Sequence, residues 1–104
     1  IPVTGDEISA RDGNENPYSF ELGQNYPNPF NPVTVINYQV PNSELVTLKI
    51  FDILGREVAA LVNEVKDAGR YNVTFDGFKL SSGIYFYTIS AGSFKDTKRM
   101  MLVK

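Results

Sequence analysis

Hydrophobic and polar residues alternate in short stretches along most of this chain, and turn-forming residues separate the stretches. The alternation is clearest in residues 45–52, 70–76 and 84–91. A period of two places successive side chains on opposite faces of a strand, so each stretch predicts a β-strand with one buried face. In residues 45–52, Val46, Leu48 and Ile50 form the predicted buried face.

Weaker stretches of the same kind predict four further strands, over residues 18–22, 33–40, 56–62 and 97–104. The stretch 56–62 places Val58, Ala60 and Val62 on one face, although its alanines and leucine would also suit a helix. Residues 63–69 predict a polar connection, and residues 91–93 a turn that joins the last two strands as a hairpin. The last strand is predicted to continue to Lys104.

Seven strands at intervals of about ten residues, joined by Gly, Pro and Asx turns, predict an all-β fold. The fold class that we expect is an immunoglobulin-like antiparallel β-sandwich of about seven strands, without the Cys and Trp of antibody domains. The length of 104 residues allows one such domain, which we place at residues 18–104.

Residues 1–17 have neither a strand period nor a helix period, and Gly, Asn and acidic residues are frequent among them. This composition predicts a flexible linker from an upstream cargo domain. The chain begins with Ile1 and Pro2 rather than with an initiator Met, so we expect it to be a piece of a longer polypeptide.

Two aromatic residues of the predicted hairpin have two interpretations. Tyr85, Tyr87 and Ile89 share the face that we expect to be core, with the tyrosine hydroxyls reaching the edge of the sandwich. The alternative is that the two rings form a platform for a sugar. That use requires both rings to be exposed.

Three prolines fall within six positions of the segment 23–32. Proline fixes φ and removes a backbone donor, so this segment cannot form a helix or a central strand. We expect a stiff surface crossover between strands, anchored at the edge of the core by Tyr26 and Phe30.

The composition excludes several kinds of chemistry. The sequence contains no His and no Cys, the commonest general base and the thiolate nucleophile. Most of the acidic residues lie at predicted strand ends, where turn roles explain them. We therefore predict that the chain is not an enzyme and has no catalytic residue, cofactor or assigned metal ligand. Calcium at residues 14–16, Asp52 or Asp76 stays open, but the spacing of an EF-hand is missing.

The formal net charge is −2, which does not indicate a nucleic-acid partner. No apolar run approaches the roughly 18 residues of a transmembrane segment.

Five stretches together resemble the successive motifs of one protein family, the type A C-terminal sorting domain of the bacterial type IX (Por) secretion system. They are residues 25–32 (NYPNPFNP), 50–58 (IFDILGREV), 75–77 (FDG), 82–87 (SGIYFY) and 97–104 (TKRMMLVK). The resemblance extends from about Leu22 to Lys104. The immunoglobulin-like domain of the flagellar hook-capping protein is similar in the Asp-Gly and Gly-Ile-Tyr region, but the proline segment and the basic last strand favour the sorting domain.

The resemblance implies that the chain is a secretion signal rather than an enzyme. Such domains direct an attached cargo protein across the outer membrane to the cell surface or the exterior, after the cargo has entered the periplasm. The implied partners are the type IX translocon and its shuttle proteins. In many members a cysteine-protease sortase cuts the preceding linker and joins the cargo to the cell surface, which places the cut within residues 5–17 here.

The same resemblance, carried over residue by residue, gives the candidate sorting and partner-binding residues. They are Pro27, Pro29 and Pro32 of the proline motif, Gly83 and Tyr85 of the Gly-x-Tyr motif, and Lys98, Arg99 and Lys104 of the basic terminal motif.

The basic last strand has two interpretations on the sequence alone. Its edge could pair with a strand of an acidic partner, or with a second copy of the chain in a weak homodimer. Alternatively, Lys98, Arg99 and Lys104 could be gatekeepers that keep an apolar edge strand from aggregating.

Two other functions are alternatives to the sorting signal. One is a carbohydrate-binding module or immunoglobulin-like spacer of a secreted hydrolase. The other is a structural domain like that of the flagellar hook-capping protein.

Overall fold

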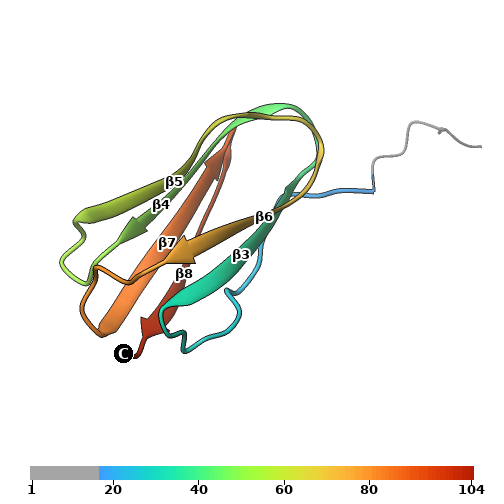
Figure 1. Ribbon diagram of the computed structural model, residues 1–104. Coiled ribbons are helices and arrows are strands. Elements are labelled where there is room, and N and C mark those ends of the chain that lie inside the picture. The colour runs from blue at the N-terminus through green and yellow to red at the C-terminus, as the bar shows by residue number, and fades with distance from the viewer. Residues whose placement is uncertain (1–16) are drawn as a thin grey trace, which may run out of the picture.

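The computed structural model describes residues 17–104 and shows two antiparallel β-sheets packed face to face (Figure 1). The strands are β2 (Glu21–Leu22), β3 (Val33–Val40), β4 (Glu44–Phe51), β5 (Glu57–Lys66), β6 (Gly69–Asp76), β7 (Gly83–Ala91) and β8 (Phe94–Leu102). One sheet has the order β2-β3-β6, and the other has the order β5-β4-β7-β8. The prediction of an all-β sandwich of about seven strands is confirmed. The predicted linker lies, except for Pro17, outside the described residues.

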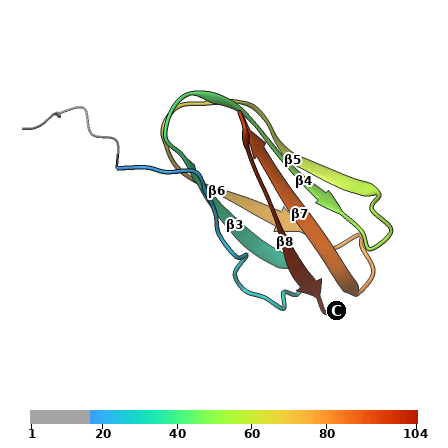
Figure 2. The ribbon, with the colours of Figure 1, turned by 180° about the vertical axis from the view of Figure 1, so that it is seen from behind.

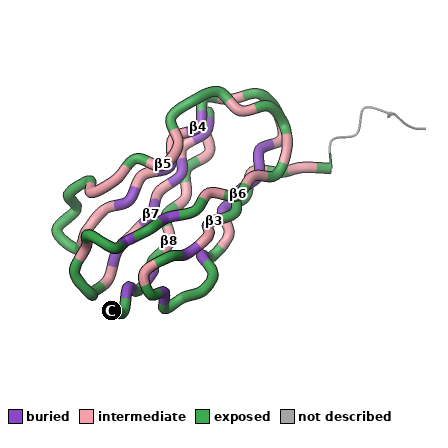
Figure 3. Tube along the Cα trace, in the orientation of Figure 1, coloured by how far each residue is buried: buried purple, intermediate pink, exposed green. Residues whose placement is uncertain are grey.

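Alternation of apolar and polar residues builds the core between the two sheets. Val46, Leu48 and Ile50 of β4 are fully buried, as the period of two predicts. The same holds for Tyr87 and Ile89 on the neighbouring strand β7. Figure 3 shows this alternation as buried segments repeated along each central strand. The predicted core faces of β4, β6 and β7 are therefore correct. For β3 the sequence predicted the strand without a core face, and Thr34, Ile36, Tyr38 and Val40 are buried.

Strand β5 differs from its prediction, because its ladder with β4 contains two irregularities. Leu48 pairs with Val62 and Lys49 with Ala60, so Leu61 is an extra residue in β5. A second shift leaves out Val58. Such bulges move adjacent residues towards the same side, and Val58, Ala59, Leu61 and Val62 all pack against the core while Ala60 is exposed. The strand also continues to Lys66, so the predicted connection shrinks to residues 67 and 68.

The last hairpin also differs in its bounds. Strand β8 begins at Phe94, three residues before the predicted start, and it ends at Leu102 rather than at Lys104. The turn between β7 and β8 is only Gly92 and Ser93. Gly92 has φ +60°, and a Cβ atom there would lie 2.8 Å from the carboxylate of Glu44, so this turn requires glycine. The first strand is shorter than predicted, with β2 covering Glu21–Leu22 alone.

The loops divide the sandwich into two ends (Figures 1 and 2). The end that we call proximal holds Pro17 and the short turns 41–43, 67–68 and 92–93. The end that we call distal holds the longer connections 23–32, 52–56 and 77–82, together with residues 103 and 104. All five family-like motifs contribute residues to the distal end.

Candidate functional site

The proline segment, residues 23–32, lies along the outer edge of β8. Phe30 donates its N–H to the carbonyl oxygen of Met101 at 2.9 Å, and its own carbonyl accepts the N–H of Val103 at 2.9 Å. These two bonds form a parallel bridge between Phe30 and Leu102. Phe30 therefore takes the place of a neighbouring strand at the distal end of β8.

Two side chains of the proline segment also bond to the outer edge of β8, and we call this segment the cover of β8. The Asn28 side-chain oxygen accepts the N–H of Met101 at 3.0 Å, and the Gln24 amide donates to the carbonyl of Arg99 at 2.8 Å. These bonds shorten the part of the β8 edge that is open to a partner strand or to a second copy of the chain. Between Arg99 and Val103 most of the outward backbone groups already have partners within the chain.

A buried polar cluster holds the proline segment from inside. Asn25 is 2% exposed, and its side-chain amide donates to Thr34 Oγ1 at 3.0 Å. The Asn25 N–H donates to the hydroxyl oxygen of Tyr87 at 2.8 Å, and that hydroxyl donates to the carbonyl of Gly23 at 2.7 Å. Thr34 Oγ1 donates to the carbonyl of Pro27 at 2.8 Å. This cluster fixes the segment across both sheets.

The cluster was missed from the sequence, but one signal for it was present. Thr34 shares a face of its strand with the apolar residues Ile36 and Val40, and a buried hydroxyl requires a partner. Burial raises the pKa of Tyr87 to about 12, and the hydrogen bond from Asn25 opposes that rise.

The three prolines lie at the surface of this segment. Pro27 and Pro29 are exposed and Pro32 is half-buried, and the peptide bonds that precede all three are cis. Between them, Phe30 is 1% exposed and fills the core, as predicted. The prediction for Tyr26 was wrong, because its side chain is 79% exposed.

Phe30 also meets the Asp-Gly turn. Its ring packs edge-on against Phe75 at a centroid distance of 6.1 Å. A Cβ atom at Gly77 would lie 3.2 Å from Leu102 and 3.3 Å from the Phe30 ring. Gly77 also donates its N–H to the carbonyl of Pro32 at 2.8 Å. A side chain at this position would therefore push against Leu102 and Phe30 at the end of the core.

Tyr85 and Lys104 hold the loop that follows, residues 77–82. The hydroxyl of Tyr85 donates to the carbonyl of Ser81 at 2.7 Å. The ammonium of Lys104 donates to the carbonyls of Phe78 at 2.5 Å and Leu80 at 2.9 Å. Lys104 is thus bound within the domain rather than presented to a partner.

Lys98 and Arg99 are placed differently from Lys104. Lys98 pairs with Tyr87 in the ladder and lies on the side of β8 that faces the other sheet, half-buried. Arg99 pairs with Phe86 and lies exposed on the opposite, outer face. Neither cation is bonded through its head group to another residue within 17–104. The structure therefore separates the three predicted cations.

Tyr85 and Tyr87 are 7% and 0% exposed. They are core aromatics with bonded hydroxyls, as predicted, and they cannot form the alternative sugar platform.

The distal end also gathers exposed apolar side chains. In the described part of the chain, the large exposed hydrophobic residues at this end are Tyr26, Val33, Ile53, Leu54, Phe78, Met101 and Val103. Those at the proximal end are Leu45 and Val65. Exposed apolar patches on proteins commonly mark interaction sites.

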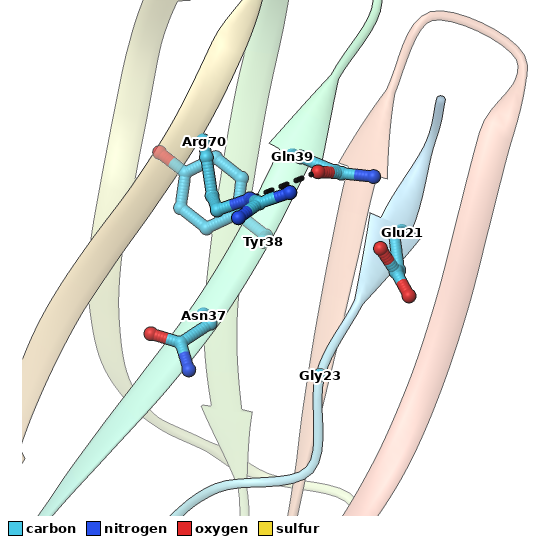
Figure 4. A pocket seen from close by; sticks show the side chains of 6 residues that line it. All are labelled: Glu21, Gly23, Asn37, Tyr38, Gln39 and Arg70. Atoms are coloured by element: carbon cyan, nitrogen blue, oxygen red, sulfur yellow. Dashed lines mark hydrogen bonds between the residues drawn. The ribbon is translucent and has the colours of Figure 1, made fainter. Parts of the chain in front are cut away.

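A depression of about 170 Å³ lies on the outer face of the three-stranded sheet (Figure 4). Glu21, Gln39 and Arg70 form a row across its strands, and Arg70 Nε donates to Gln39 Oε1 at 3.2 Å. This row provides polar contacts without a nucleophile and a base. No three His, Cys, Asp or Glu side chains of residues 17–104 gather as a metal site would require.

Comparison with known families decides what these motifs are. Residues 24–104 match the family described as the secretion system C-terminal sorting domain. The chain belongs to this family. The sorting domain is therefore a C-terminal signal of type IX secretion, and it directs export across the cell envelope to the surface or the exterior.

Members of this family are in general non-catalytic, and they interact with the secretion system. A search of curated proteins with this chain found no match. No helix in its described part is long and apolar enough to span a membrane.

Replacing Tyr87 by Phe tests the buried cluster through pH. The folded domain holds the Tyr87 proton up to a pKa of about 12, against an ordinary value of 10.0, so this contribution to stability is complete below pH 10. It falls as the pH rises from 10 to 12, by about 1.4 kcal/mol per pKa unit. At neutral pH we expect Tyr87→Phe to cost about 1–3 kcal/mol, because two buried backbone groups lose their partner.

Urea unfolding of both proteins from pH 7 to 12 checks this expectation. The difference in unfolding free energy between the wild type and Tyr87→Phe should narrow above pH 10. The ionisation of the other tyrosines occurs in both proteins and cancels in this difference. A constant difference across the range would contradict it.

Proposed function

We propose that the sorting domain is a non-catalytic signal that is read as a folded surface, and that the type IX translocon and its shuttle proteins are the readers. The observation that best supports this is the convergence of five motifs from distant parts of the sequence on the distal end. A signal read as an unfolded segment would not need them to meet.

The candidate residues divide into two roles in this proposal. Pro27, Pro29 and Pro32 shape the cover over β8, while Tyr85 and Lys104 fix loop 77–82. Gly83 pairs with Leu102 where β7 starts. These residues build the surface.

Lys98 and Arg99 contact the partner in this proposal. Their head groups are not engaged with other described residues, and they lie on the two faces of one strand. Free cations of this kind give charge complementarity to an acidic partner and speed its encounter.

We also propose that residues 1–17 are the linker between a cargo domain and the sorting domain at residues 18–104. A cysteine-protease sortase would cut this linker within residues 5–17. Cleavage by proteases concentrates at linkers, termini and loop tips, whereas the backbone of the strands is protected.

A reporter experiment tests the signal and the cut together. A fluorescent protein with an N-terminal Sec signal carries residues 1–104 at its C-terminus. It is produced in a host with a working type IX system and in one that lacks the outer-membrane translocon. We expect the reporter outside the first host only, with a mass that places the cut within residues 5–17. Retention of a folded reporter in the periplasm of both hosts would contradict the signal, and a cut after Tyr18 would contradict the linker.

The pair Lys98→Glu with Arg99→Glu tests the reading residues. We expect secretion of the reporter to fall about tenfold, equivalent to about 1.4 kcal/mol of lost binding free energy. The matched control is Lys66→Glu with Arg70→Glu, which makes the same charge change away from β8 and should leave secretion near the wild-type level. Thermal unfolding confirms that both variants fold. Equal secretion of the two variants would show that Lys98 and Arg99 are not read.

A further inference from the structure

We propose that the β4–β5 hairpin tip and the apolar groove beside it are a second docking element. A protein of the secretion machinery binds this element, and an apolar pocket of that protein receives the tip. This inference rests on the proposed function, and it concerns a motif that the candidate residues leave without a role. The docking element consists of Ile53 and Leu54 at the tip, with Val58, Phe75, Phe78 and Leu80 around the groove.

The tip presents two neighbouring apolar side chains to solvent. Ile53 is 72% exposed and Leu54 is 74% exposed. Neither contributes to the core, and a hairpin of this length could carry polar residues at both positions without loss of packing. The tip therefore exposes apolar area that the fold itself does not use.

The tip is also rigid. The carboxylate of Asp52 accepts the N–H groups of Leu54 and Arg56, each at 2.9 Å, and the Arg56 Nε at 2.8 Å. The backbone of Asp52 makes two further bonds across the turn, to Arg56 and Gly55. The N–H of Arg56 is the main reason that the pKa of Asp52 lies below its ordinary value. A turn whose backbone is already held in place loses less entropy on binding, so this geometry suits a specific partner.

A groove of about 300 Å³ lies next to the tip, between the start of β5 and the loop after β6. Val58, Phe75, Phe78 and Leu80 supply its apolar lining. Figures 1 and 2 show loops 52–56 and 77–82 side by side at the distal end. A convex tip beside a concave groove requires a partner with its own complementary shape, as folded proteins have.

The charges at the base of the tip favour a protein over a lipid surface. Arg56 is paired with Asp52, and Lys49 lies 3.5 Å from Glu57. Asp76 and Lys79 both line the groove, and the Lys104 ammonium lies 5.4 Å from the centre of the Phe78 ring. The charges around the docking element are therefore of both signs and do not form a basic cluster. Segments that bind anionic lipids carry an excess of Lys and Arg instead.

The secretion reporter tests the docking element with two double variants. Ile53→Ser with Leu54→Ser removes the apolar tip and keeps Asp52 and Gly55. Leu45→Ser with Val65→Ser is the matched control, since these residues are also exposed, at 56% and 65%, but lie at the proximal end. We expect the tip variant to be secreted at least about tenfold less than the wild type, and the control to stay within about twofold.

The outcomes separate this inference from the proposed function. Secretion of the tip variant at the wild-type level, with the wild type itself secreted, overturns the docking element alone. Failure of the wild-type reporter overturns the proposed function and the docking element with it.

Site-specific photo-crosslinking keeps the test independent of folding. A photo-reactive amino acid replaces Leu54 in one reporter and Leu45 in the other. We expect a protein adduct from position 54 that is absent from position 45 and absent in the host without the translocon. Adducts to lipid alone, or equal protein adducts from both positions, would overturn the proposal.

Discussion

The outer edge of β8 is the constraint on which this structure depends. An edge strand exposes backbone donors and acceptors to any other strand, and the distal end of β8 is apolar, with Met100, Met101 and Leu102 in succession. The chain supplies its own partner, because Phe30 bonds to Met101 and Val103, and Asn28 bonds to Met101 as well. Proline suits the residues between these contacts, since it cannot donate a ladder bond and so prevents the cover from growing into a regular strand.

Once that edge is covered, the motifs of the sorting domain acquire distinct physical roles. Tyr87, Asn25 and Thr34 hold the cover from inside, Gly77 lets the core close beneath it, and Lys104 fastens the neighbouring loop. These residues therefore build the distal surface through contacts within the domain. In our proposal a partner reads Lys98, Arg99 and the apolar side chains of the distal end.

The period of two was sufficient to predict β4, β6 and β7 with their buried faces, because one side of each of these strands is the more apolar. It predicted β3 as a strand but did not distinguish its two faces. It misled in β5, where two bulges place Val58 beside Ala59 and Leu61 beside Val62 on the core, a spacing that also suits a helix. The bonds between the proline segment and β8, and those between Lys104 and loop 77–82, could not be predicted from the sequence. They join residues as far apart as Asn28 and Met101, separated by 73 positions, and no local pattern records such contacts. The resemblance supplied candidate residues, but it did not indicate which of them make contacts within the domain.

Hydrogen exchange of the backbone amides along β8 tests the covered edge most directly. Met101 and Val103 donate to the proline segment, whereas the N–H of Arg99, which points the same way by the alternation of the ladder, has no acceptor among the described residues. Residue-resolved exchange measured by NMR on residues 1–104 should therefore show slow exchange at Met101 and Val103 and fast exchange at Arg99. Fast exchange at all three positions would mean that the proline segment does not cover this edge, and that β8 is open to a partner strand after all.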